Sequence, residues 1–197
     1  MFFCATIFFA YDRIGIRDID SYAYTTGAMT LKSGFGYKWL TGEVITHWPP
    51  GFSLLLSCFD SPIHAGRIIN FLCFGLFSGA FYTLARLSHW SWQASLGLCL
   101  ILGSGFFRLT AATIKPDVFT YFAFTVALLV IRVPRARLVA YIVWGALIPI
   151  KLVAVVFIPA ALLAEFYLGG MKNIKWRIYV APILIWIFFL MTIFYFN

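Results

Sequence analysis

The feature of this sequence that most limits its fold is a series of long apolar stretches separated by short segments that carry charges. Residues 66–87 and 178–196 are the clearest examples. A bilayer core about 30 Å thick is crossed by a helix of roughly 17–25 mostly apolar residues. The chain is 62% hydrophobic and only 11% charged, whereas soluble domains average about 25% charged residues. We therefore predict an integral membrane protein of the all-α class, a polytopic transmembrane helical bundle.

Charges and prolines divide the longer apolar runs. As one helix, residues 92–131 would extend about 60 Å, roughly twice the bilayer core. A charge at mid-membrane costs roughly 2.5–3.5 kcal/mol. The segment 108–117, with Arg108, Lys115 and Asp117, therefore predicts a turn between spans at 92–107 and 118–131. Pro149 and Lys151 similarly divide spans at 138–150 and 152–168. With 66–87 and 178–196, about six spans are expected after residue 65.

The N-terminal third is more polar. Residues 1–10 are apolar but too short to span, and they lack the basic segment of a signal peptide. They are expected to form part of a truncated first helix. Residues 11–65 predict a long outer loop carrying short surface helices, one of them at 21–33, with Asp20 as its N-cap and Gly34 closing it. Together these segments make a single transmembrane domain, residues 1–197.

The distribution of positive charge predicts the orientation. The net charge is +8, but the basic residues lie between apolar segments rather than in one stripe, so nucleic acid is not an expected partner. Loops at 86–89, 132–137 and 172–177 are the richest in basic residues, and such loops are usually cytoplasmic. The outer loop, the 108–117 turn and Lys151 then share the opposite face. This convergence predicts a polar site at the outer membrane face.

Two carboxylates in the outer loop are the first candidates for chemistry. Asp18 and Asp20 are two residues apart, and in an extended segment both side chains would point the same way. Such a pair could accept a proton from a hydroxyl group or bind a divalent cation such as Mg²⁺ or Mn²⁺. The alternative is structural: Asp20 only caps the following helix, and Asp18 pairs with Arg17.

Basic and aromatic residues supply the other candidates. Lys151, Lys115 and Arg108 could neutralise a phosphate, although basic residues at helix ends commonly extend to the membrane interface. His47 and Trp48 precede two prolines and a glycine. This segment could contribute to binding, or it could be only a rigid turn that returns the chain to the membrane, with Trp48 at the interface.

The order of several short motifs resembles a known family. The chain has DSY at 20–22, GFGY at 34–37, HWPPGF at 47–52, KPD at 115–117 and IK at 150–151. This set is similar to the first outer loop and later turns of bacterial GT-C glycosyltransferases, in particular glycosyltransferase family 39. That family includes protein mannosyltransferases and lipid A aminoarabinose transferases. The chain has fewer predicted spans than these proteins usually have, so it resembles a truncated member.

The resemblance implies a multi-pass enzyme of the bacterial inner or plasma membrane. Such an enzyme transfers a sugar, with inversion, from a polyprenyl-phosphate carrier to a lipid, glycan or protein acceptor at the outer face. It implies that an acidic residue of the outer loop is the catalytic base or organises the site, with Asp20 as the first choice and Asp18 as the alternate. The residues expected to bind substrate or phosphate are Lys151, Lys115, Arg108, His47, Trp48 and Asp117.

Two other hypotheses are left open by the residues. The chain could be a non-enzymatic polytopic membrane protein, such as a transporter fragment or a lipid-binding subunit, or a non-functional truncation product. A transporter would be expected to place ionisable groups near the midplane of broken helices. Here the charges fall at the ends of the apolar segments, which favours a site at the membrane face.

Overall fold

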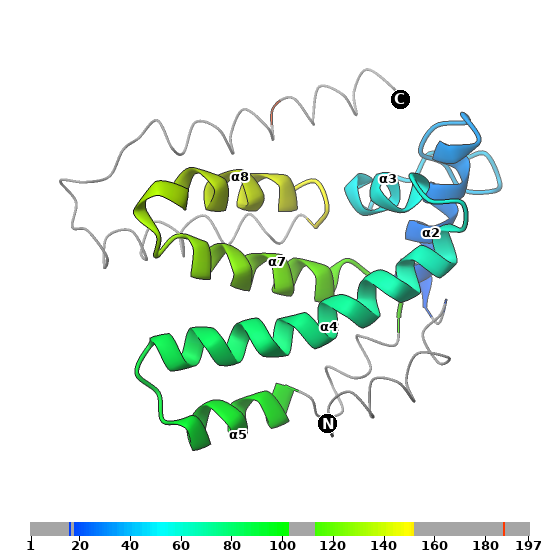
Figure 1. Ribbon diagram of the computed structural model, residues 1–197. Helices are drawn as coiled ribbons and strands as arrows, with labels where there is room; N and C mark the ends of the chain where they lie inside the picture. Colours follow the sequence, from blue (N-terminus) through cyan, green and yellow to red (C-terminus); the bar gives the residue numbers. More distant parts are fainter. Residues whose placement is uncertain (1–15, 17, 103–112, 152–186, 188–197) are drawn as a thin grey trace.

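A computed structural model describes residue 16, residues 18–102 and 113–151, and residue 187 (Figure 1). The described residues are helical and form no strand, which confirms the all-α class for this part of the chain. One isolated antiparallel bridge joins Lys38 and Val44. The predicted segments 1–10, 152–168 and most of 178–196 lie outside the described residues, as does Arg108.

Helix α2, Ile19–Lys32, forms where a short helix is predicted at 21–33, but it is not a surface helix, because eight of its 14 residues are buried. The predicted cap at Asp20 is wrong: Asp18 is the N-cap, with an extended backbone and a side chain that accepts a hydrogen bond from the Ser21 N–H. The helix therefore begins two residues earlier than expected, and Asp20 lies in its first turn. The predicted end is confirmed, because Gly34 has a φ of 78°, in the left-handed region that glycine adopts easily.

Helix α3, Gly51–Ser57, follows the two prolines, and helix α4, Pro62–Leu87, follows the Ser61 cap. At about 1.5 Å per residue, α4 is about 39 Å long. Among the described residues, α4 alone is long and apolar enough to cross a membrane. Only 28% of its most apolar window is buried inside the structure.

Three shorter helices follow α4. They are α5, Trp92–Leu102, α7, Asp117–Val130, and α8, Arg137–Leu147, with a 3-10 turn at Pro134–Ala136 before α8. The beginnings of α7 and α8 agree with the expected segments to within one residue. Helix α7 packs between α4 and α8 (Figure 1). Tyr141, Trp144 and Leu147 of α8 form a buried cluster with Ala127 and Ile131.

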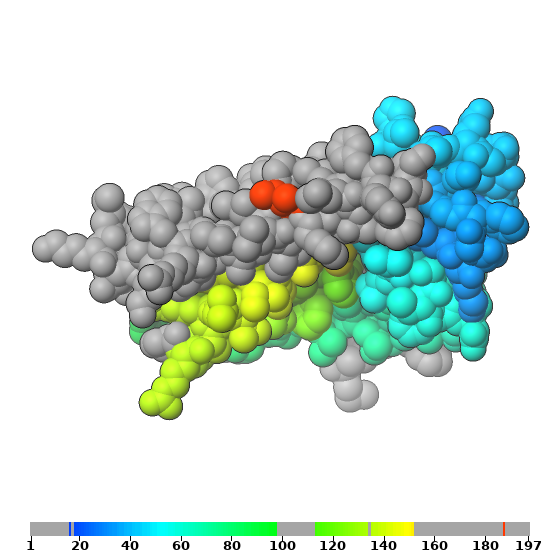
Figure 2. All heavy atoms as spheres, turned by 90° about the horizontal axis from the view of Figure 1, so that it is seen from above, coloured from blue at the N-terminus to red at the C-terminus, as the bar shows by residue number. Residues whose placement is uncertain are grey.

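Two sets of contacts define the two ends of this helical layer. At one end, the Gly51 N–H donates to the Pro149 carbonyl, so α3 abuts the turn after α8. At the other, Arg132 donates to the Leu87 carbonyl and joins the turn after α7 to the end of α4. Figure 2 shows the cyan residues of α3 beside α8 on one face, with the blue residues of α2 beyond them.

Small residues allow the close approach at the first of these ends. A Cβ atom at Gly51 would lie 2.5 Å from the Pro149 carbonyl oxygen, closer than real Cβ contacts. A Cβ at Gly66 would likewise overlap the side chain of Ile114. These contacts hold α3 against the turn that precedes Lys151 and α4 against the segment that carries Lys115.

Candidate functional site

A lysine and two carboxylates meet where α2 begins. The Lys115 ammonium group forms ion pairs with Asp18 Oδ2 and, at 3.2 Å, with Asp20 Oδ2. Lys115 lies two residues before α7, so this contact joins the start of α2 to the start of a helix almost 100 residues later. All three side chains are only partly buried, at 21% exposure for Lys115, 33% for Asp18 and 41% for Asp20.

Asp18 is the more constrained of the two carboxylates. Its Oδ1 accepts hydrogen bonds from the Ser21 N–H at 2.8 Å and the Ser21 hydroxyl at 2.7 Å, and its Oδ2 faces Lys115. Burial alone would raise the pKa of Asp18, but the hydrogen bonds from Lys115 and Ser21 outweigh it and lower the pKa below its usual 3.8. Asp18 is therefore ionised and committed to holding the helix start.

Asp20 connects the ion pairs to a group of aromatic rings. The Trp48 indole N–H donates to Asp20 Oδ1 at 3.0 Å. Trp48 also packs edge-on against Trp39, with ring centroids 5.6 Å apart, and Trp39 stacks on Tyr22 at the same separation. Trp39 lies in a tight loop in which its N–H donates to the Glu43 carbonyl. Asp20 thus lies at the edge of an aromatic surface that is half open to solvent.

A second ion pair forms between the two later turns. The Lys151 ammonium group contacts Asp117 Oδ1, with 27% of the lysine side chain and 16% of the aspartate exposed. Asp117 is the first residue of α7, where a negative charge is stabilised by the helix dipole. Lys151 follows the turn that the Gly51–Pro149 hydrogen bond holds against α3.

Tyr24 links the two ion pairs electrostatically. This side chain of α2 is 4% exposed and packs edge-on against Phe52 of α3. Burial raises the pKa of its phenol strongly, and the neighbouring charges of Tyr37, Asp117 and Asp20 raise it further. Tyr24 also shares a buried cluster with Ile114, the neighbour of Lys115, and Ile150, the neighbour of Lys151, packs against the same cluster. The two ion pairs therefore belong to one polar region, here called the acidic end.

Arg67 and Asn70 on α4 add polar groups beside the segment that carries Lys115. The Asn70 amide donates to the carbonyl of Thr113, two residues before Lys115. Asn70 Oδ1 and Arg67 Nε are buried without a hydrogen-bond partner. Arg67 directly follows Gly66, which contacts Ile114. Unlike Lys115 and Lys151, Arg67 has no carboxylate partner in the described part of the chain.

The structure thus brings together Asp18, Asp20, Lys115 and Trp48 in one group, and Asp117 with Lys151 in an adjacent one. His47 lies apart from the ion pairs: its ring is exposed and faces Trp48 at 5.8 Å between centroids. Arg108 lies outside the described residues.

The arrangement does not fit a divalent cation between Asp18 and Asp20. Lys115 places its ammonium group between the two carboxylates, where the cation would have to lie. Within the described segments, no group of three or more His, Cys, Asp or Glu side chains is placed to hold a metal ion. The expectation of Mg²⁺ or Mn²⁺ at Asp18 and Asp20 therefore has no geometric support.

Sequence reasoning missed several members of the site. Ser21, Tyr24 and Trp39 were not singled out, although Ser21 bonds Asp18 and Trp39 positions Trp48. Ser21 and Tyr24 lie one and four residues after Asp20, so helical spacing could have placed Tyr24 on the same face. Trp39 gave no such signal, because its position depends on the Lys38–Val44 bridge.

Comparison with known proteins adds no relatives: no protein-family model, curated protein or solved structure matches this chain.

Proposed function

We propose that this chain is a membrane glycosyltransferase, or a piece of one, that moves a sugar from a polyprenyl phosphate to an acceptor at the outer membrane face. The observation that carries the proposal is the meeting of Asp18, Asp20 and Lys115 beside the Lys151–Asp117 pair. Carboxylates and lysines from three distant segments supply both charges that the reaction requires. The GT-C-like order of motifs along the sequence supports the same assignment.

In this proposal the membrane is crossed several times. Helix α4 is the span that its length and composition support, and little of its apolar surface is buried within the protein. Helices α7 and α8 are shorter apolar helices of 14 and 11 residues that pack beside it. We place them in the same bilayer, with the acidic end at its outer face.

The chemistry is a displacement at the anomeric carbon. An acceptor hydroxyl forms a new C–O bond, the bond from the sugar to the phosphate breaks, and the released polyprenyl phosphate keeps the electron pair. The hydroxyl proton passes to a carboxylate, and positive charge stabilises the departing phosphate. Asp20 takes the role of base because it is the more exposed carboxylate, whereas Asp18 is occupied by capping α2.

Lys151, Lys115 and Arg67 are the cations for the phosphate. Both lysines are neutralised by carboxylates in the described structure, so a phosphate would have to exchange with Asp117 or Asp18 for their ammonium groups. Arg67 requires no such exchange, and its planar group can form two parallel hydrogen bonds to a phosphate. Trp48 and Trp39 offer apolar ring faces beside Asp20 on which a sugar ring can lie.

The test is sugar transfer by the whole chain in membranes, from a panel of labelled polyprenyl-phosphate sugars. Asp20→Asn is expected to lower the transfer rate by about 10²–10⁴-fold, the range for loss of a general base. Asp60→Asn is the matched control, because Asp60 is also a carboxylate of the outer loop but is exposed and pairs only with Lys32. Equal rates for the two variants would exclude Asp20 as the base.

The internal neutralisation of both lysines favours a second candidate, a lipid-binding subunit without catalysis. Binding of unglycosylated polyprenyl phosphate, measured beside sugar transfer, distinguishes the lipid-binding subunit from the enzyme. Binding of this lipid that depends on Arg67 and Lys151, with no transfer from any donor in the panel, would support the subunit. Transfer that is lost in Asp20→Asn but retained in Asp60→Asn would support the enzyme.

A further inference from the structure

The opposite end of the helical layer carries arginines with a different kind of partner. Arg86 donates to the Trp90 carbonyl at 2.7 Å, and Arg132 donates to the Leu87 carbonyl at 2.9 Å and to the Ser88 hydroxyl at 3.3 Å. Arg137 donates to the Ile131 carbonyl at 3.1 Å. The partners of Arg86 and Arg132 are neutral, so they fix these two guanidinium groups in place without compensating their positive charges.

No described carboxylate lies near these arginines. The five described acidic residues are all on segments of the acidic end: Asp18, Asp20, Glu43, Asp60 and Asp117. Arg135, in the turn between α7 and α8, is exposed and makes no hydrogen bond or ion pair with the described residues. The set Arg86, Arg132 and Arg135, here called the arginine end, is therefore a concentration of positive charge with no counterion among the described residues.

Apolar side chains are exposed beside these charges. Trp90 is 48% exposed, Trp92 55% and Val133 52%. Tryptophans are enriched where a protein passes from the hydrocarbon core of a bilayer to its headgroups. Helix α4, at about 39 Å, is longer than a hydrocarbon core of about 30 Å, so its last turns reach the headgroup layer if the acidic end lies at the opposite face.

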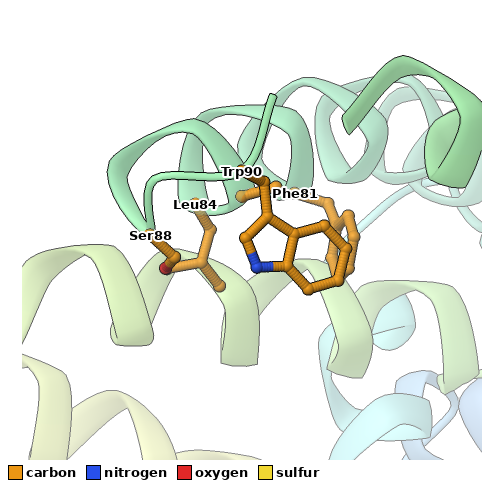
Figure 3. A pocket seen from close by; sticks show the side chains of 5 residues that line it. Phe81, Leu84, Ser88 and Trp90 are labelled. Carbon is orange, nitrogen blue, oxygen red and sulfur yellow. The ribbon is translucent and has the colours of Figure 1, made fainter. Parts of the chain in front are cut away.

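A hollow at the end of α4 adds a place for an apolar chain. It is lined by Phe81, Leu84, Ala85, Ser88 and Trp90 (Figure 3) and has a volume of about 150 Å³. Its lining is mostly apolar, and its polar member is Ser88. The Ser88 hydroxyl accepts a hydrogen bond from Arg132, so a fixed guanidinium group lies at the rim of the hollow.

We infer that the arginine end binds an anionic phospholipid of the surrounding bilayer, with its phosphate at Arg132 and Arg135 and part of an acyl chain in the hollow beside Trp90. Arg132 uses two of its five N–H groups on Leu87 and Ser88, so further donors are available for a phosphate. This site is independent of the proposed transfer reaction and lies at the other end of α4. It depends on α4 spanning the bilayer.

An anionic lipid suits this surface better than other anions. A soluble phosphate would use the arginines but not the exposed tryptophans or the hollow. A nucleic acid would need a continuous basic stripe, and these arginines are confined to two turns. A lipid headgroup with its acyl chains uses the charge, the aromatic rings and the hollow together.

The experiment is quenching of Trp90 fluorescence in nanodiscs of phosphatidylcholine that contain the whole chain. Phosphatidylglycerol with brominated acyl chains is added in small amounts, and brominated phosphatidylcholine is added in a parallel series. The Trp90→Phe variant isolates the signal of Trp90 from that of the other tryptophans by difference. The expected result is that phosphatidylglycerol quenches Trp90 at a lower mole fraction than phosphatidylcholine does.

Arg135→Gln is the principal variant, because Arg135 is exposed and makes no hydrogen bond or ion pair with the described residues, so its loss is not expected to disturb folding. It should lower the preference for phosphatidylglycerol about fivefold, the effect of one basic residue at an anionic surface. Arg132→Gln should lower it by at least as much, and Arg132→Lys, which keeps the charge, by less. Lys38→Gln is the matched control, because it removes one positive charge at the acidic end.

Equal quenching by the two lipids would overturn the inference, as would an equal loss of preference in Lys38→Gln and Arg135→Gln. Stronger quenching by a brominated polyprenyl phosphate than by phosphatidylglycerol would also overturn it, because the occupant would then be the lipid carrier. Failure of sugar transfer alone would not affect the result, so the two proposals fail separately.

Discussion

The two ends of the helical layer hold their basic residues in opposite ways. At the acidic end, Lys115 and Lys151 contact carboxylates, so their charges are largely cancelled within the protein. At the arginine end, Arg86 and Arg132 contact backbone carbonyls and keep their charges. The same excess of positive charge in the sequence therefore has two physical roles. Both ends join distant segments, but the acidic end cancels its positive charge in ion pairs, whereas the arginine end presents it to the surroundings.

The difference also concerns what a substitution would leave behind. Removing Lys115 would leave two carboxylates facing each other in a partly buried place, which adds repulsion to the loss of the ion pair. Removing Arg132 would leave a helix-end carbonyl and a serine hydroxyl, both of which water can reach. Substitutions at the acidic end should therefore lower the free energy of unfolding more than substitutions at the arginine end.

The largest effect is expected for Gly51→Ala. The added Cβ would meet the Pro149 carbonyl, a backbone atom that can move only together with its turn. Overpacking of this kind costs about 1–3 kcal/mol, to be measured as the free energy of unfolding in detergent micelles. Gly79→Ala is the control, because no described atom lies within 4 Å of a Cβ there. If both variants were equally stable, the contact between α3 and the turn before Lys151 would be unimportant.

Lys115→Met should destabilise the protein by about 1–2 kcal/mol, because it leaves both carboxylates without their cation. The side chains keep partial contact with water, which holds the cost below that of a fully buried pair. Unfolding of Lys115→Met is compared with that of Lys115→Met combined with Asp18→Asn. The second substitution should recover part of the loss; a purely additive result would show that the two side chains do not interact.

Arg132→Met should cost only about 0.5–1 kcal/mol, the usual net contribution of exposed hydrogen bonds. The free energy of unfolding is measured in the same way. Arg135→Met should leave it unchanged, because Arg135 makes no hydrogen bond or ion pair with the described residues. A loss for Arg132→Met as large as that for Lys115→Met would contradict the proposed difference between the two ends.

The smallest effect is the pH dependence of stability, because the titrating side chains remain partly exposed. The pKa of Asp18 is lowered, so its contribution is complete above its unfolded pKa near 3.8 and is lost as the pH falls through the lower folded value. Burial alone would lower the pKa of Lys115, but the hydrogen bonds to Asp18 and Asp20 raise it above 10.5. Its contribution is therefore complete below pH 10.5 and is lost as the pH rises through the folded value.

Unfolding curves in acid and in base check both limits. The double variant Asp18→Asn and Lys115→Met should flatten the dependence at both extremes, whereas Arg132→Met should leave it unchanged, because arginine does not titrate in this range. A flat wild-type curve would show that the ion pairs at the acidic end do not stabilise the protein.

Local features of the fold were predictable from the sequence, and contacts between distant segments were not. The end of α2 followed from Gly34, and the beginnings of α7 and α8 followed from charges and prolines next to apolar runs. The start of α2 was misassigned because aspartate suits an N-cap at either Asp18 or Asp20. Only the Ser21 N–H, which bonds Asp18, distinguishes the two positions.

The candidate site shows the same limit. The charge pattern predicted that Asp18, Asp20, Lys115 and Lys151 lie on one side of a membrane, but it did not predict which of them form ion pairs. Lys115 pairs with Asp18 and Asp20, whereas Lys151 pairs with Asp117. This pairing depends on how α3 contacts the turn after α8, through Gly51 and Pro149. The order of charged residues along the sequence does not show which of these distant side chains will form ion pairs. The arginine end was visible as basic loops, but its hydrogen bonds to carbonyl groups were not.

The hydrogen bond from Gly51 to Pro149 couples any movement of α3 to the segment before Lys151. A displacement of α3 away from α8 would pull Pro149 with it and draw the Lys151 ammonium group off Asp117. A ligand that wedges beneath α3 would thereby free a cation without touching it.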